Sequence, residues 1–184
     1  MRQIHNPLPQ QNRRVSRNFH FGLARDGAEI SVSAANGEAN AIRSENGNLN
    51  LNFEGSATIN GDVKAVNSVS LSNGGNATVN GDIEGKSLAA GAEIGTVSGK
   101  MKFSQAADLT VKNSVGSLEI GTIESADIAK VDGSTVIGTA TGNVKIGEAQ
   151  DVAIENASSF EFGQISGNLD ITKEVDVLCP KLGQ

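Results

Sequence analysis

Residues 94–120 of the chain read IGTVSGKMKFSQAADLTVKNSVGSLEI, and this stretch decides the fold. Its apolar residues come in pairs that flank one intervening residue, at intervals of eight or nine residues: Met101/Phe103, Leu109/Val111 and Leu118/Ile120. Side chains two positions apart lie on the same face of a β-strand, so each pair indicates a short strand with one buried face. The Gly, Asn and Ser residues between the pairs are typical of sharp turns.

The same step extends in both directions, from Ile30 to Val177. Clear pairs recur at Leu49/Leu51, Ala57/Ile59, Val69/Leu71, Ala77/Val79, Val144/Ile146, Val152/Ile154, Phe160/Phe162 and Leu169/Ile171. Weaker elements lie near Ile42, Leu88, Ile94, Ile128 and Val136. Strands of this length fit two architectures: an antiparallel sandwich, for which the Asn-Gly dipeptides would be hairpin turns, and a parallel β-solenoid.

A longer period favours the solenoid. Ile94, Ile120, Ile146 and Ile171 are separated by 25 or 26 residues, and a sandwich has no reason to keep that register. Three strands of about 8.5 residues would fill such a period. The sequence therefore predicts an all-β, single-stranded parallel β-solenoid: a right-handed, three-faced β-helix with about 25 residues per coil and about five or six coils.

The composition agrees with a narrow interior and tight corners. Only 3% of the 184 residues are aromatic, with no Trp or Tyr, whereas there are 22 Gly. The three prolines, which cannot donate a ladder hydrogen bond, all lie outside the repeat, at Pro7, Pro9 and Pro180.

The predicted organisation has three parts. Residues 1–18 form a flexible basic arm, residues 19–178 form the solenoid, and residues 179–184 form a short tail. The solenoid is expected to begin with a capping strand, because apolar and other residues alternate there. The cap residues are Phe19, Phe21 and Leu23.

Charge divides the chain unevenly. Residues 1–25 carry five Arg and no acid, whereas the remainder carries 10 basic and 21 acidic residues. Arg13, Arg14 and Arg17 are therefore candidates to contact an anionic partner, which could be RNA, DNA, an anionic membrane or the acidic body of a neighbouring subunit. The alternative interpretation is a solvated tail.

The ends of a solenoid expose unpaired backbone groups, which natural proteins either cap or use for association. Val175, Val177 and Leu178 close the repeat just before Pro180, and only a short tail follows them. We expect these three residues to form an end-to-end interface with another copy of the chain or with another protein.

The chemistry of the chain argues against catalysis. His5 and His20 both precede the repeat and Cys179 is the single cysteine, so we expect no catalytic triad, no metal site and no cofactor. The acids are scattered singly, as on a solvated face. A small polysaccharide-active β-helix enzyme is the alternative, and a pocket lined by three or more charged residues on one face would favour it.

No apolar run is long enough for a transmembrane helix, and no cleavable signal peptide is visible. We therefore expect a cytoplasmic protein, or one exported without a cleavable signal. The sequence identifies no small-molecule substrate.

Two motifs carry a resemblance: Gly-Asp-Val/Ile, at 61–63 and 81–83, and Ile-Ser-Gly-Asn-Leu-Asp-Ile at 165–171. These segments resemble those of bactofilins, which are polymer-forming bacterial cytoskeletal proteins, and those of adhesin-like β-solenoid domains. The resemblance implies end-to-end assembly and no catalytic residues. The leading hypothesis is a non-enzymatic scaffold that acts by self-association or protein binding, and the main alternative is an adhesin-like or exported effector binding module.

Overall fold

The structure, a computed structural model, describes residues 13–15, 30–34, 37–44, 47–53, 56–174 and 177–178. Every regular element in these ranges is a β-strand, and no helix occurs in them. The strands are β1 (Arg13–Val15), β2 (Ile30–Ala34), β3 (Gly37–Ser44), β4 (Leu49–Phe53), β5 (Ala57–Ala65), β6 (Ser68–Ser72), β7 (Gly74–Val79), β8 (Ile83–Leu88), β9 (Ala92–Ile165), β10 (Leu169–Glu174) and β11 (Val177–Leu178).

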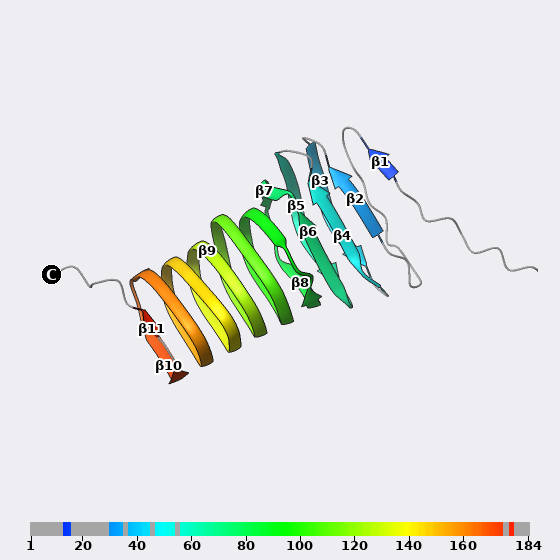
Figure 1. The fold of residues 1–184 in the computed structure, drawn as a ribbon. Helices are drawn as coiled ribbons and strands as arrows, with labels where there is room; N and C mark the ends of the chain where they lie inside the picture. Colours follow the sequence, from blue (N-terminus) through cyan, green and yellow to red (C-terminus); the bar gives the residue numbers. More distant parts are fainter. Residues whose placement is uncertain are drawn as a thin grey trace, which may run out of the picture.

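All the pairings between these strands are parallel, and together they make one 11-stranded sheet. The sheet winds into a β-solenoid of about seven turns, with β1 at one end and β10 and β11 at the other (Figure 1). β9 is a single strand of 74 residues because strand pairing continues round several coils without a break. The predicted parallel β-solenoid is confirmed, and the antiparallel sandwich is excluded.

The predicted coil of about 25 residues is wrong. Ile30 pairs with Leu49 and Leu49 with Val69, whereas Val152 pairs with Leu169, so the coil shortens from 19–20 residues near the N-terminus to 17 near the C-terminus. Seventeen residues are two of the eight-to-nine-residue steps, so the 25-to-26-residue period spans about one and a half coils. Shorter coils give about seven turns instead of five or six. The right-handed sense of winding stays a prediction.

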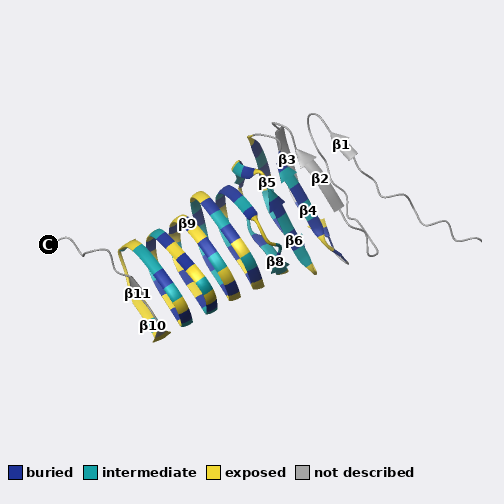
Figure 2. Ribbon diagram, viewed as in Figure 1, coloured by how far each residue is buried: buried dark blue, intermediate teal, exposed yellow. Residues whose placement is uncertain are grey.

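The core is a stack of inward-pointing side chains along the solenoid axis, seen as repeating buried positions in Figure 2. In one coil the buried side chains are Leu109, Val111, Val115, Leu118, Ile120 and Ile123. Large and small residues compensate one another between coils. Phe103 pairs with Gly85, and a Cβ on Gly85 would lie 3.3 Å from Phe103 Cε1, so glycine makes room for the ring.

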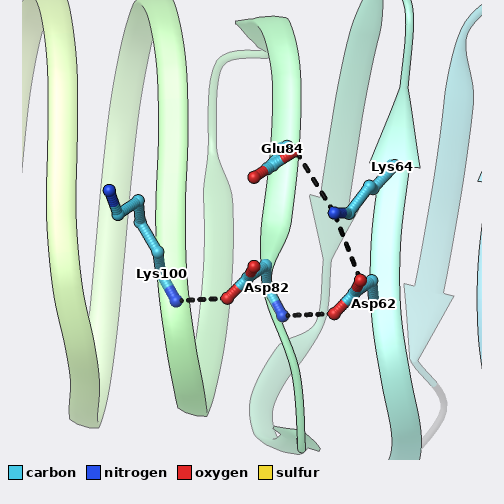
Figure 3. A network of polar contacts seen from close by, with 5 residues as sticks. All are labelled: Asp62, Lys64, Asp82, Glu84 and Lys100. Carbon is cyan, nitrogen blue, oxygen red and sulfur yellow. Dashed lines mark hydrogen bonds and ion pairs between the residues drawn. The ribbon is translucent and has the colours of Figure 1, made fainter.

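The Asn-Gly-Asp motifs form corners between stacked coils. The Asn80 side chain donates to Asn60 Oδ1 at 2.8 Å, and the Asp82 backbone N–H donates to Asp62 Oδ1 at 3.0 Å. The ladder continues with the Lys100 backbone N–H, which donates to Asp82 Oδ1 at 2.8 Å (Figure 3). Each corner aspartate thus satisfies a backbone donor of the next coil, which explains why the motif recurs after 20 residues.

Candidate functional site

The C-terminal end of the solenoid is formed by β10 and β11, which both pair with β9. Within the described ranges neither strand has a second strand on its outer side. The apolar column that runs through Val152 reaches the surface here: Val152 is 2% exposed, whereas its ladder neighbour Leu169 is 41% exposed. This end therefore presents the partly exposed Leu169 beside strand edges that no described strand covers.

Two of the three residues expected at an end-to-end interface lie in β11. Val177 pairs with Phe160 and Leu178 with Glu161, so both belong to the terminal coil. Val175 lies outside the described residues.

The N-terminal end carries β1, whose Arg13 and Arg14 pair with Val32 and Ser33 of β2. The strand lies within the segment predicted to be the basic arm, and β2 is its only strand neighbour in the part of the chain that the structure describes. The remaining residues predicted for the arm and the cap lie outside that part: Arg17, Phe19, Phe21 and Leu23. The same holds for His5, His20 and Cys179.

The two ends differ in charge. Residues 1–25 contain five Arg and no acid, whereas residues 155–174, which lead through the last described coil, contain four acids and one Lys. Asp170 lies in β10 and is exposed. In the sequence, the segment 1–25 is therefore basic, whereas residues 155–174 are acidic.

Ion pairs join neighbouring coils on the lateral surface. Lys64 Nζ lies 3.2 Å from Asp62 Oδ2 and 3.4 Å from Glu84 Oε2 (Figure 3). One coil further, Glu119 binds Lys102 at 2.7 Å and Lys100 at 3.2 Å. Lys64 and Asp62 lie two residues apart in β5, whereas the contacts to Glu84 and Glu119 link charges about one coil apart.

Hydrogen bonds and ion pairs shift the pKa values of Asp62, Lys64, Lys102 and Glu119 toward the charged state. The pKa of Asp62 is lowered, first by the hydrogen bond from the Asp82 backbone and then by Lys64. Hydrogen bonds from Lys102 and Lys100 lower the pKa of Glu119. A general acid or base acting near neutral pH needs a pKa displaced toward neutrality, so these groups have the electrostatics of structural ion pairs.

Near the C-terminal end, three successive coils line a polar hollow of about 390 Å³. Its polar lining consists of Lys130, Asp132, Glu148, Gln150, Gln164 and Ser166. Lys130 Nζ lies 2.9 Å from Asp132 Oδ1, and this hydrogen bond raises the pKa of Lys130. The hollow could not be predicted from the sequence, because a 25-residue coil places these residues on different faces, whereas a 17-residue coil stacks them.

The described ranges contain no group of three or more His, Cys, Asp or Glu side chains that could hold a metal ion. Nor do they include a helix with the length and apolar character needed to span a membrane. The chain matches no family model, no curated protein and no solved structure. The function must therefore be inferred from the geometry of the chain itself.

Proposed function

We propose that this chain is a non-enzymatic scaffold that acts by self-association, or by binding another protein, through the ends of its solenoid. The observation that carries the proposal is the C-terminal end, where β10 and β11 offer outer edges next to the exposed Leu169. A parallel strand edge of this kind is a template on which a further strand can pair.

The lateral surface supports the proposal. Its polar side chains are engaged in contacts from coil to coil: Asn156 donates to Thr139, Ser159 donates to Asn143, and Ser125 donates to Asp108. Such ladders hold successive coils in register. The ends of the solenoid are then the places where strand pairing stops and a further strand can be added.

Sedimentation velocity over a wide concentration range tests the proposal. We expect the weight-average sedimentation coefficient to rise with concentration. A chain that stays monomeric at the highest concentration, and that retains no protein in pull-downs, would contradict it.

We further propose that the chain is related to bactofilins or to adhesin-like domains, and that it comes from a bacterium. We also propose that it is located in the cytoplasm, or that it is exported without a cleavable signal. They depend on the resemblance of the Gly-Asp-Val/Ile segments. Fusing residues 1–25 to a reporter tests the exported alternative, since a reporter that stays inside the cell removes the argument that this segment directs export.

The polar hollow favours one second candidate, a carbohydrate-active or carbohydrate-binding solenoid. Lys130, Asp132 and Glu148 supply three charged groups on one face, with Gln150 and Gln164 as further hydrogen-bonding groups. Titration with a panel of oligosaccharides, followed by NMR, tests this candidate. Shifts confined to the hollow and lost in Glu148→Gln would support it, whereas an unchanged spectrum would contradict it.

A further inference from the structure

We propose that two copies of this chain also associate side by side, with antiparallel solenoid axes, through a row of alternating charges on the lateral surface. The charge row consists of one residue from each of four successive coils: Lys64, Glu84, Lys102 and Glu119. The partner is a second copy of the chain, related to the first by a two-fold axis that passes between Glu84 and Lys102. This contact goes beyond the proposed function, which uses the ends of the solenoid.

Strand pairing fixes the spacing of the charge row. Lys64 pairs with Glu84 and Glu84 pairs with Lys102 in the parallel ladder. In the next coil, Glu119 Oε1 lies 2.7 Å from Lys102 Nζ. Neighbouring strands of a sheet lie about 4.8 Å apart, so the four positions are evenly spaced along the solenoid axis. A copy of the row that is turned end for end can therefore be aligned with it, position against position.

The side chains of the row are accessible to a partner. Their exposed fractions range from 33% for Lys64 to 53% for Lys102, and no described element covers them. Each of the four has an ionic contact within its own chain, as Figure 3 shows for Lys64 and Glu84. An ammonium group has three donors and a carboxylate has about four acceptor sites, so each charge can bind a second partner.

The alternation of sign makes the row complementary to its own reverse. From Lys64 to Glu119 the signs are positive, negative, positive and negative. A two-fold axis parallel to the strands reverses the row, so Lys64 lies opposite Glu119 of the second copy and Glu84 lies opposite Lys102. Every charge of both rows then faces an opposite charge, as an isologous interface with electrostatic complementarity requires.

The residues at the adjoining corner fit the same arrangement. Asp62, Asp82, Lys100 and Ser117 each precede a member of the row by two residues, so they lie on the same face as the row. The proposed axis also passes between Asp82 and Lys100, which are neighbours in Figure 3, so each of them faces the other across the interface. Asp62 faces the uncharged Ser117. The corner thus adds opposite charges and no contact between like charges.

Other ways of joining two rows oppose like charges. A two-fold axis parallel to the solenoid axis places Lys64 against Lys64 and Glu84 against Glu84. An antiparallel arrangement centred on Glu84 itself places Glu84 against its own copy and Lys64 against Lys102. Like charges oppose association, so the charges select the antiparallel arrangement with its axis between Glu84 and Lys102.

Two variants of the row test the inference. The all-positive variant carries Glu84→Lys and Glu119→Lys, so each contact across the axis becomes repulsive. It should weaken self-association at least roughly tenfold in dissociation constant. The inverted variant carries Lys64→Glu, Glu84→Lys, Lys102→Glu and Glu119→Lys. It keeps the alternation, so it should associate with itself but not with the unchanged row, because in an antiparallel pair each charge would then face a like charge.

Fluorescence-detected sedimentation velocity at low salt, with one of the mixed chains labelled, measures both self-association and mixing. All chains carry Val177→Lys, which weakens the end contact of the proposed function, and thermal unfolding shows that each variant is folded. The control, Glu124→Lys with Asp127→Lys, adds the same charge at exposed positions outside the row and should associate like the unchanged row. Association should also weaken in about 1 M salt, where the Debye length is about 3 Å.

Three results would overturn the lateral contact: a Val177→Lys chain that stays monomeric at low salt, an all-positive variant that associates as tightly as the unchanged row, or an inverted variant that binds the unchanged row. The first of these leaves the end contact standing. If Val177→Lys instead associates as tightly as the wild type, and the all-positive variant does not, the lateral contact is supported and the end contact of the proposed function is overturned.

Discussion

At the scale of the single residue, Thr135 is a polar side chain buried in the apolar core. The side chain is 1% exposed, and its hydroxyl is the buried side-chain polar atom without a hydrogen-bond partner among the described residues. It stands one 17-residue step from both Leu118 and Val152 in an apolar column. Burying a hydroxyl without a partner costs about 1–3 kcal/mol.

Thr135→Val should therefore stabilise the protein. Valine has nearly the same shape and removes the unpaired hydroxyl, so we expect the free energy of unfolding to rise by about 1 kcal/mol. Urea denaturation measures it, and the exposed Thr122→Val is the matched control, with a change within about 0.5 kcal/mol. A loss of stability in Thr135→Val would show that the hydroxyl serves a purpose in the folded chain.

Asp62 makes stability depend on pH. Its pKa lies below the ordinary value of 3.8, so the carboxylate stabilises the folded state above that value, and this contribution is lost as pH falls through the lowered pKa. Because the pair with Lys64 is exposed, the contribution is less than about 1 kcal/mol.

Asp62→Asn keeps an oxygen for the Asp82 N–H but removes the charge. We expect it to be slightly less stable than the wild type at neutral pH and equally stable in acid, below the lowered pKa. Urea denaturation at the two pH values measures the difference. If the variant is less stable than the wild type by the same amount at both pH values, the loss comes from the changed shape of the side chain and not from its charge.

Most inward residues could be predicted from the sequence, and the exceptions have a physical reason. The pairs Leu118/Ile120 and Val152/Ile154 were predicted and are buried. Near Val136, hydrophobicity predicted the wrong inward residue. Val136 is 46% exposed, whereas Thr135 and Ile137 point inward. Hydrophobicity alone cannot orient a strand when a polar residue occupies an inward position.

At the scale of the element, the backbones of successive coils approach one another closely at glycine positions of β9. A Cβ on Gly138 would lie 2.5 Å from the carbonyl oxygen of Gly121, one coil earlier. The same geometry recurs at Gly133, where a Cβ would lie 2.8 Å from the Gly116 oxygen. Glycine is thus required at these positions by the packing of one coil on the next.

Gly138→Ala should lower the free energy of unfolding by about 1–3 kcal/mol, because the added methyl group meets backbone that cannot move without breaking the ladder. Thermal and urea unfolding measure the loss. Ser158→Ala, at an exposed position of the same strand, is the control and should change stability little. A neutral Gly138→Ala would mean that coils can separate locally at low cost.

The strand step of eight or nine residues could be predicted from the sequence, but the number of steps in a coil could not. Ile94 and Ile120 recur at a period that spans one and a half coils, so the recurrence relates strands on different faces. The spacing of the Asn-Gly-Asp motifs equals the length of a coil in that part of the chain, since Asn60 and Asn80 stack one coil apart. Polar corner residues report the coil more directly than the apolar pairs do, because each bonds its counterpart in the next coil.

At the scale of the whole molecule, the sequence predicted where the solenoid ends better than it predicted the lateral surface. The terminal strand β11 contains Val177 and Leu178, as expected for an end. The hollow around Lys130 and Glu148 depends on the coil length and could not be found without it. To predict a feature at an end, only the position of the last repeat must be known. To predict a feature on the lateral surface, the register of every coil must be known.

Val177→Lys tests the end at this scale. Lysine on an edge strand is a device by which natural proteins prevent edge-to-edge association, because a second strand can pair there only by desolvating the ammonium group. Val177 lies in β11, in the coil that ends the described solenoid. We therefore expect association to weaken by roughly tenfold or more, about 1.4 kcal/mol or more, in sedimentation equilibrium.

The control variant must introduce the same positive charge at a position away from the end of the solenoid. Thr122→Lys does so at an exposed lateral position and should associate like the wild type. If Val177→Lys and Thr122→Lys both weaken association equally, net charge and not the end strand governs it. If Val177→Lys associates like the wild type while the wild type assembles, the interface lies on the sides of the solenoid, and the lateral stripes of ion pairs around Glu119 become the surface to test.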